Sequence, residues 1–214
     1  MTINFPNAAL LVIDVQYDFC PAGALGVEEG DQVIEPLNRL AALFAAKAGR
    51  IIATQDWHPA GHASFASFHG KNPGEIVDLP GLKGQYLWPD HCIQGSRGAD
   101  FHEALDMRQP TLIIRKGFRQ NLDSYSAFFE NDRITSTGLD GFLKSLSINT
   151  LVLGGLATDY CVLYSALDAR TLGYNTIIAE DAVRGVGLPP GSVEEAYRLL
   201  KGAGVTFAKS GDIQ

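Results

Sequence analysis

Six short apolar runs, most of them separated by stretches of helical periodicity, limit the possible folds of this chain more than any other feature. The apolar runs are rich in β-branched residues and lie at residues 8–15, 50–54, 111–115, 150–153, 175–179 and 205–208. Helical periodicity is found at residues 31–47, 139–146, 161–172 and 192–200. Nearly continuous apolar strands that alternate with helices are typical of a parallel sheet covered on both faces. The sequence therefore predicts a three-layer α/β/α protein with a central, mostly parallel sheet of about six strands.

The length and composition predict one globular domain over residues 1–214. A chain of 214 residues with 46% apolar and 19% charged residues is long enough for one substantial core. Residues 55–105 differ from the rest because Gly, Pro, His and Asp dominate there. Long irregular insertions in compact domains are usually functional. We therefore expect a loop insertion at about residues 55–105 to contribute to a site.

Charge and cysteine content narrow the range of partners and locations. The net charge is -7 and no cluster of basic residues is present, which argues against a nucleic-acid partner. Cys20, Cys92 and Cys161 lie far apart, which favours reduced thiols in the cytoplasm over a disulfide framework. Residues 8–13 are too few to span a membrane, and no basic segment precedes them. We expect a cytoplasmic protein with no membrane partner.

Four polar or reactive residues follow the predicted strands. Ligands of parallel α/β sheets bind beyond the carboxyl ends of the strands. Asp14 ends the first run, Asp56 follows the second, Lys116 follows the third, and Cys161 comes after the fourth. The sequence therefore predicts that these four side chains converge at one edge of the sheet.

Cys161 is the candidate nucleophile. It begins a predicted helix after a strand that ends in two glycines. At a helix N-terminus the dipole and the N–H groups lower the pKa of a thiol, and the same N–H groups can hold an oxyanion. Asp14 is then a candidate general base and acid, and Lys116 a group that stabilises negative charge. The alternatives are a small buried cysteine, a structural aspartate and a solvated lysine.

A metal site is predicted from Asp56, His58 and His91. Asp56 and His58 project to the same side of an extended segment, which Pro59 enforces, and His91 lies in the same insertion. Two histidines and a carboxylate suit Zn²⁺, or Fe²⁺ and Mn²⁺. Solvated loop histidines are the alternative.

Phosphoryl transfer is a weaker hypothesis. Residues 91–97 resemble the His-Cys-x-x-Gly-x-x-Arg loop of cysteine phosphatases, but the segment is one residue too short. Neither a P-loop nor a dinucleotide-binding glycine motif occurs.

Six segments in a fixed order resemble the cysteine hydrolases of the isochorismatase-like fold, and among them the nicotinamidases (pyrazinamidases). The resemblance extends from about residue 8 to residue 207. The segments are residues 11–19 (LVIDVQYDF), 56–59 (DWHP), 88–92 (WPDHC), 116–117 (KG), 123–128 (DSYSAF) and 155–162 (GLATDYCV).

The resemblance implies hydrolysis of nicotinamide to nicotinate and ammonia through a cysteine thioester, with pyrazinamide as a second substrate. By position, Cys161 matches the nucleophile, Asp14 the proton carrier, and Lys116 the third member of the triad. A cis peptide between Leu156 and Ala157 is implied, with the N–H groups of Ala157 and Cys161 as the oxyanion hole.

The resemblance also assigns a metal and a pocket. Asp56, His58 and His91 match the ligands of a divalent metal that binds the pyridine nitrogen, and His62 is a candidate additional ligand. The implied pocket residues are Phe19, Leu25, Trp88, Tyr125, Leu156 and Tyr160. Three questions stay open: whether the substrate is another small amide, whether the chain is a non-catalytic binding homologue, and whether it forms a homo-oligomer.

Overall fold

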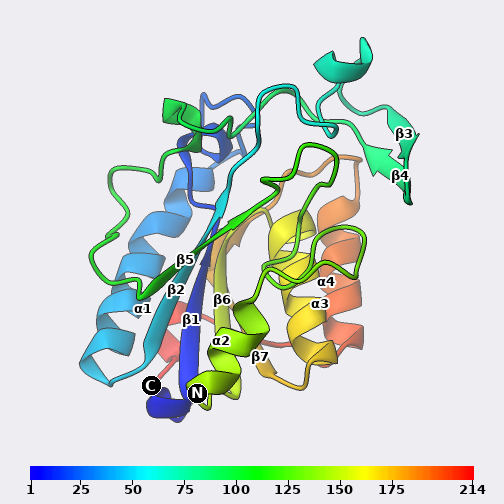
Figure 1. The fold of residues 1–214 in the computed structure, drawn as a ribbon. Coiled ribbons are helices and arrows are strands. Elements are labelled where there is room, and N and C mark those ends of the chain that lie inside the picture. The colour runs from blue at the N-terminus through cyan, green and yellow to red at the C-terminus, as the bar shows by residue number, and fades with distance from the viewer.

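The computed structural model describes residues 1–214 and is built on one six-stranded parallel sheet (Figure 1). The strand order is β5-β2-β1-β6-β7-β8, and every neighbouring pair is parallel. The strands are β1 (Ala8–Ile13), β2 (Arg50–Asp56), β5 (Leu112–Lys116), β6 (Thr150–Leu156), β7 (Asn175–Arg184) and β8 (Thr206–Ala208). The six apolar runs of the sequence are therefore the six strands of this sheet.

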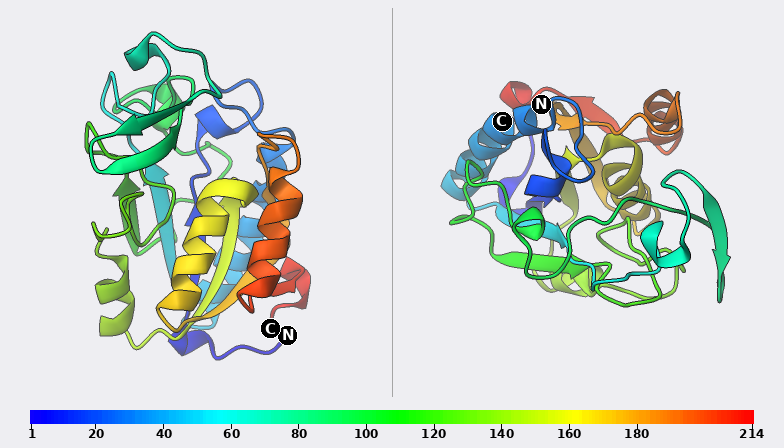
Figure 2. Two further views of the ribbon diagram at one scale, coloured as in Figure 1. Left: turned by 90° about the vertical axis from the view of Figure 1, so that its right-hand side faces the viewer. Right: turned by 90° about the horizontal axis from the view of Figure 1, so that it is seen from above.

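Helices cover both faces of the sheet, as expected. The four helices are α1 (Ile34–Ala46), α2 (Leu139–Ser145), α3 (Leu163–Thr171) and α4 (Ser192–Gly202). Helix α1 packs on one face, and α2, α3 and α4 lie on the other (Figures 1 and 2). Each face has its own hydrophobic cluster, of 26 and 22 buried residues, so the sheet is buried on both sides. The predicted three-layer α/β/α class is confirmed. None of the helices is long and apolar enough to span a membrane.

The periodic stripe of α1 explains its position. Leu37, Leu40 and Phe44 project from one side of the helix and are at most 1% exposed. These side chains lie three or four residues apart, which places them on one helical face against the strands.

The insertion contains a two-stranded sheet that the sequence did not reveal. Strands β3 (Ile76–Leu79) and β4 (Leu82–Tyr86) pair antiparallel and stand out from the main body (Figure 1). The pairing shifts register between Val77 and Leu79. Such a short, largely solvent-exposed hairpin buries little apolar surface, so no clear periodicity marks it in the sequence.

The order of the strands creates a crevice at the centre of the sheet. From β1 the chain builds outward through β2 and β5, and it then crosses to build β6, β7 and β8 on the other side. Strands β1 and β6 are therefore neighbours at the point where the winding reverses. Open parallel sheets bind ligands beyond the strand ends at such a reversal.

Candidate active site and metal centre

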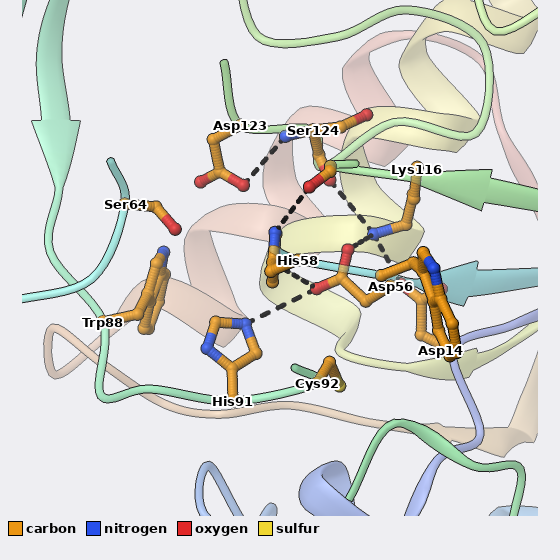
Figure 3. A network of polar contacts seen from close by, with 12 residues as sticks. Asp14, Asp56, His58, Ser64, Trp88, His91, Cys92, Lys116, Asp123 and Ser124 are labelled. Atoms are coloured by element: carbon orange, nitrogen blue, oxygen red, sulfur yellow. Dashed lines mark hydrogen bonds and ion pairs between the residues drawn. The ribbon is translucent and has the colours of Figure 1, made fainter. Parts of the chain in front are cut away.

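The four residues predicted from the strand ends meet at this crevice. Asp14 directly follows β1, Asp56 ends β2, Lys116 ends β5, and Cys161 lies in the turn after β6. All four are buried, between 0% and 6% exposed. Figure 3 shows Asp14, Asp56 and Lys116 in one network of polar contacts. The structure thus brings together side chains that lie up to 147 positions apart in the sequence.

Lys116 is the centre of the network. Its Nζ lies 2.8 Å from Asp14 Oδ2 and 2.8 Å from Asp56 Oδ1. It also donates to the Ser124 carbonyl at 3.0 Å and lies 3.4 Å from Cys161 Sγ. A fully buried ammonium is stable only when paired with charges and hydrogen-bonded, and these contacts meet both conditions.

The charges of the network shift one another's pKa values. Burial alone would lower the pKa of Lys116, but the carboxylates of Asp14 and Asp56 outweigh it and raise that pKa well above its ordinary value. Burial acts on Asp56 in the opposite sense, yet His58 and Lys116 hold its pKa well below the usual range. For Asp14, burial prevails over the attraction of Lys116 and the pKa is raised. The Asp14 carboxyl is therefore the one suited to take up and release a proton.

Burial raises the pKa of the Cys161 thiol well above the ordinary value, Lys116 opposes this, and Asp14 and Asp56 add to it. The expectation that a helix N-terminus lowers this pKa is therefore wrong. A thiolate would add a negative charge beside the carboxylates of Asp14 and Asp56. Cys161 also does not begin a regular helix, because it is the fourth residue of a single π turn, Thr158–Val162, that precedes α3.

Asp14 is held in a fixed orientation beside the thiol. Thr54 Oγ1 donates to Asp14 Oδ1 at 2.6 Å and accepts from the Asp14 N–H at 3.2 Å. The other carboxylate oxygen, Oδ2, faces Lys116 and accepts no further hydrogen bond. Lys116 Nζ contacts both groups, Asp14 Oδ2 at 2.8 Å and Cys161 Sγ at 3.4 Å. The carboxylate and the thiol therefore lie on the same ammonium.

The predicted cis peptide is present between Leu156 and Ala157. The Ala157 N–H donates to no group of the chain, whereas the Ala157 carbonyl accepts from the N–H groups of Tyr160 and Val162, both at 3.1 Å. A free backbone donor thus lies four residues before the thiol.

Asp56, His58 and His91 form a group whose ligand atoms lie within 4.8 Å of one another. His58 Nε2 is 3.0 Å from Asp56 Oδ2, and His91 Nε2 is 3.5 Å from the same oxygen. The Nδ1–H groups of the two rings donate to the carbonyls of Gly117 and Pro89, at 2.9 and 2.8 Å. These bonds orient both Nε2 atoms inward, as in metal sites where the second ring nitrogen is hydrogen-bonded. The donor set therefore fits a divalent metal of the zinc type.

Asp56 joins the two halves of the site. Its Oδ1 accepts from Lys116 and its Oδ2 faces the two histidines (Figure 3). One carboxylate therefore contacts both the buried ammonium and the two histidines.

His62 lies beside this group. Its ring packs against the His58 ring at 4.4 Å between centroids, and its Nδ1 pairs with Ser64 Oγ at 2.7 Å. His58, His62 and Asp123 form a second group with ligand atoms within 4.8 Å. Burial and the neighbouring His58 lower the pKa of His62, so its ring stays neutral and able to bind a metal. A ligand role for His62 stays a prediction.

A small cavity opens onto Cys161 and onto two of the predicted metal ligands, Asp56 and His91. Trp88 donates its indole N–H to the Tyr125 hydroxyl at 3.1 Å and meets the Tyr160 ring edge-to-face at 4.7 Å. The lining residues are Phe19, Leu25, Asp56, Trp88, His91, Asp123, Tyr125, Tyr160, Cys161 and Val186.

Five of the six predicted pocket residues line this cavity, and Leu156 does not. Leu156 is 0% exposed and belongs to the hydrophobic cluster on the α1 face, so its side chain points into the core. Asp123 and Val186 also line the cavity, and neither was predicted as a pocket residue. Asp123 stands in a segment already singled out by resemblance, whereas the only signal for Val186 is its place beyond the carboxyl end of β7.

The phosphatase-like segment does not form a phosphate loop. The Cys92 N–H donates to Asp18 Oδ2 at 2.7 Å, and an anion would be repelled from a donor that a carboxylate already holds. The Arg97 guanidinium lies over the Tyr17 ring, 4.6 Å from its centroid. This arrangement contradicts the hypothesis of phosphoryl transfer at Cys92.

Known proteins resemble the chain over most of its length. A family model described as "Isochorismatase domain" matches residues 8–210. The nicotinamidase of Acinetobacter baylyi is 46% identical over 208 residues, which is 97% of this chain and 94% of that protein. A solved structure titled as an Acinetobacter baumanii nicotinamidase and pyrazinamidase is 46% identical, with a TM-score of 0.92 over 97% of this chain and 98% of the other. The pyrazinamidase of Pyrococcus horikoshii, solved in complex with zinc, is 33% identical, with a TM-score of 0.78 over 95% and 99%.

Proposed function

The chain belongs to the isochorismatase family, and from this membership we propose that it is a nicotinamidase, an amidohydrolase that converts nicotinamide to nicotinate and ammonia. The observation that carries the proposal is the buried cluster of Asp14, Lys116 and Cys161 beside a metal-ligand set and an aromatic cavity. Relatives that are 46% identical over nearly the whole chain bear the same name.

The cavity supports a small, flat aromatic amide as the substrate. Trp88, Tyr125 and Tyr160 offer ring faces and edges, and Phe19 adds a fourth aromatic side chain. Aromatic rings pack against one another in offset or edge-to-face arrangements that such a lining provides. Pyrazinamide differs from nicotinamide by one ring nitrogen in place of a C–H group, so the same cavity accommodates both.

Asp56, His58 and His91 would hold the divalent metal, for which Zn²⁺ is the first candidate and Fe²⁺ and Mn²⁺ are alternatives. When bound, the metal would supply a Lewis-acidic contact for the pyridine nitrogen and so orient the ring. The ligands adjoin the same cavity as Cys161, so a ring held there would present its amide to the thiol.

The first half of the reaction uses the thiol and Asp14. Asp14 takes the proton of the Cys161 thiol as the sulfur attacks the amide carbonyl. The N–H groups of Ala157 and Cys161 stabilise the oxyanion, and Lys116, 3.4 Å from Sγ, offsets the negative charge that passes between sulfur and carboxylate. Asp14 then gives the proton to the amide nitrogen, the C–N bond breaks, and ammonia leaves behind a Cys161 thioester.

The second half returns the enzyme to its starting state. A water molecule attacks the thioester carbonyl while Asp14 accepts one of its protons. The C–S bond breaks, nicotinate forms, and the proton on Asp14 returns to Cys161. The raised pKa of Asp14 suits a carboxyl that must hold a proton between these steps.

Ammonia release from nicotinamide by the zinc-loaded protein tests the proposal, with Cys161→Ala as the decisive variant. Release by the wild type and none by Cys161→Ala is the expected result. Cys20→Ala serves as a matched control, because Cys20 is also buried but lies in the α1-side core, and it should retain turnover. Release by Cys161→Ala at the wild-type rate would eliminate the proposed nucleophile.

A panel of other small amides tests the alternative that the chain hydrolyses a different substrate on the same fold. Turnover of another amide with none of nicotinamide would favour that alternative. Cytoplasmic location, a single domain and assembly as a homo-oligomer stay predictions.

A further inference from the structure

The segment 185–191, between β7 and α4, forms part of the pocket although the sequence gives it no chemical motif. Val186 lines the cavity together with Leu25 and Phe19. The aromatic residues Tyr125 and Tyr160 line it as well, but they come from the other face of the sheet. Val186 and Leu25 pack against the hydrophobic cluster of the α1 face, whereas Tyr125 and Tyr160 pack against the cluster of the other face. The cavity thus has one aliphatic side to which Val186 contributes.

The N–H groups at the start of this segment are held by one carboxylate. None of the residues from 185 to 191 is buried. Asp159, only 4% exposed, accepts from the Val186 N–H and the Gly187 N–H, each at 2.9 Å, and from Ser192 Oγ at 2.6 Å. Hydrogen bonds to an ionised carboxylate are stronger than those between neutral groups.

The same turn that presents the nucleophile therefore fixes this side of the cavity. Asp159 and Cys161 lie in one π turn, and Tyr160 between them donates its hydroxyl to the Leu188 carbonyl at 2.5 Å. Gly185 completes the close approach, because a Cβ there would lie 2.4 Å from Val193 Cγ2 and 3.2 Å from Asp159 Oδ1. The distance between the sulfur and Val186 is thus set by contacts within a few residues of the thiol.

We propose that Val186 determines which ring substituents the pocket accepts, and that Asp159 is the positioning residue that holds Val186 against the ring. This proposal rests on the proposed function, since it concerns the ring of the same substrate. Asp159 touches no reacting atom. It acts through the segment that it binds.

The first measurement compares kcat/KM for nicotinamide with kcat/KM for its mono-methylated ring analogues. Val186→Ala removes two methyl groups from the wall, and one methylene in an apolar pocket changes discrimination by roughly 10- to 200-fold. We expect at least one analogue to gain about tenfold or more relative to nicotinamide. Unchanged ratios for every analogue would overturn the assignment of Val186.

Asp159→Asn tests the positioning role. The variant should relax discrimination toward the same analogue, and KM should change more than kcat because the wall moves and the triad does not. A uniform loss of kcat for all substrates would overturn this role. In the double variant with Val186→Ala, Asp159→Asn should add nothing to the change in discrimination. Additive effects would contradict action through Val186.

Asp132→Asn is the matched control. The Asp132 carboxylate accepts from two N–H groups, of Ile134 and Thr135, at 3.0 and 2.9 Å, and from the Thr135 hydroxyl at 2.6 Å. Asp132 thus accepts the same kinds of hydrogen bond as Asp159, from two N–H groups and one hydroxyl. None of the residues in this second set lines the cavity. Asp132→Asn should leave discrimination unchanged, and an equal change there would overturn a specific role for Asp159.

Two measurements keep the proposal testable if Asp159→Asn folds poorly or if the proposed function fails. Ser192→Ala removes one of the three bonds to Asp159 and should shift discrimination in the same direction by a smaller factor. Hydrogen exchange needs no substrate: the amides of Val186 and Gly187 should exchange faster in Asp159→Asn than in the wild type. If the wild type releases no ammonia from nicotinamide, the proposed function fails, and unchanged exchange at both amides would separately refute the anchoring by Asp159.

Discussion

Replacing Lys116 with methionine should destabilise the protein more than almost any other single change. Lys116 is 0% exposed and its Nζ lies 2.8 Å from a carboxylate oxygen on each of two residues, Asp14 and Asp56. At an effective dielectric constant near 20, each contact is an attraction of about 6 kcal/mol before desolvation is subtracted. Removing one partner of a buried ion pair costs about 3–5 kcal/mol, because the remaining charge is left uncompensated. In a chain of this size, that lowers the melting temperature by about 6–20 °C.

The loss should depend on pH in a definite direction. Without Lys116, burial raises the pKa of Asp14 further above its unfolded value, so the folded variant binds more protons than the unfolded chain. The stability of the variant therefore rises as the pH falls toward the ordinary pKa of a carboxyl group. In the wild type, Lys116 opposes the rise in the pKa of Asp14, so the gain in stability on acidification is smaller than in the variant. The pKa of the wild-type Asp56 lies well below the ordinary range, so its contribution is constant at neutral and mildly acidic pH. The difference in melting temperature between the two proteins should narrow from about pH 8 to about pH 5.

Thermal unfolding of both proteins after chelation is the appropriate assay, since a metal would itself compensate the charge of Asp56. Lys144→Met is the control, because Lys144 makes an equally short contact, 2.7 Å to Asp140, on the surface with 60% of its side chain exposed. The melting temperature of that variant should equal that of the wild type. If Lys116→Met has the wild-type melting temperature at pH 8, or if the difference in melting temperature grows in acid, the account of the buried charges is wrong.

Three other predictions concern the geometry around the thiol and the metal. Gly117→Ala should lower bound zinc, measured by elemental analysis, because a Cβ there would lie 2.4 Å from His58 Cε1 at a φ of +64°; wild-type zinc content would contradict this. In metal-free protein, Cys161 should react with iodoacetamide more slowly than free cysteine and faster as the pH rises, because its pKa is raised. Mass spectrometry of the peptide that contains Cys161 measures the alkylation. A rapid reaction whose rate does not change with pH would show that Cys161 is a thiolate instead. Thr54→Val removes the 2.6 Å hydrogen bond to Asp14, which lowers the pKa of that carboxyl. The acidic limb of the pH–rate profile should therefore move to higher pH, and an unmoved limb would argue against Asp14 as the titrating base.

Much of the fold and the centre of the site could be predicted from the sequence. Alternation of apolar runs and helical periodicity identified the six strands and four helices, because burial on two faces requires that pattern. The rule that the strand ends of a parallel sheet share one edge predicted that Asp14, Lys116 and Cys161 lie together. The ligand types of Asp56 and His58, two residues apart in an extended segment, pointed to a metal.

Other features depended on contacts that the sequence does not encode locally. The hairpin of β3 and β4 buries too little surface to leave a pattern. Val186 lines the cavity from a segment whose N–H group binds Asp159, 27 residues earlier in the chain. Leu156 belongs to the cis peptide bond before Ala157, yet its side chain points into the core.

The pKa of Cys161 shows what local sequence predicts and what only the tertiary structure determines. Local sequence predicted a lowered pKa from the start of a helix, and the folded protein raises it, because burial and the carboxylates of Asp14 and Asp56 outweigh the nearby Lys116. The sequence by itself determined which chemical groups are present and which edge of the sheet they occupy. Only the tertiary structure decided their protonation and the shape of the cavity, because both depend on desolvation and on distances between residues far apart in the chain.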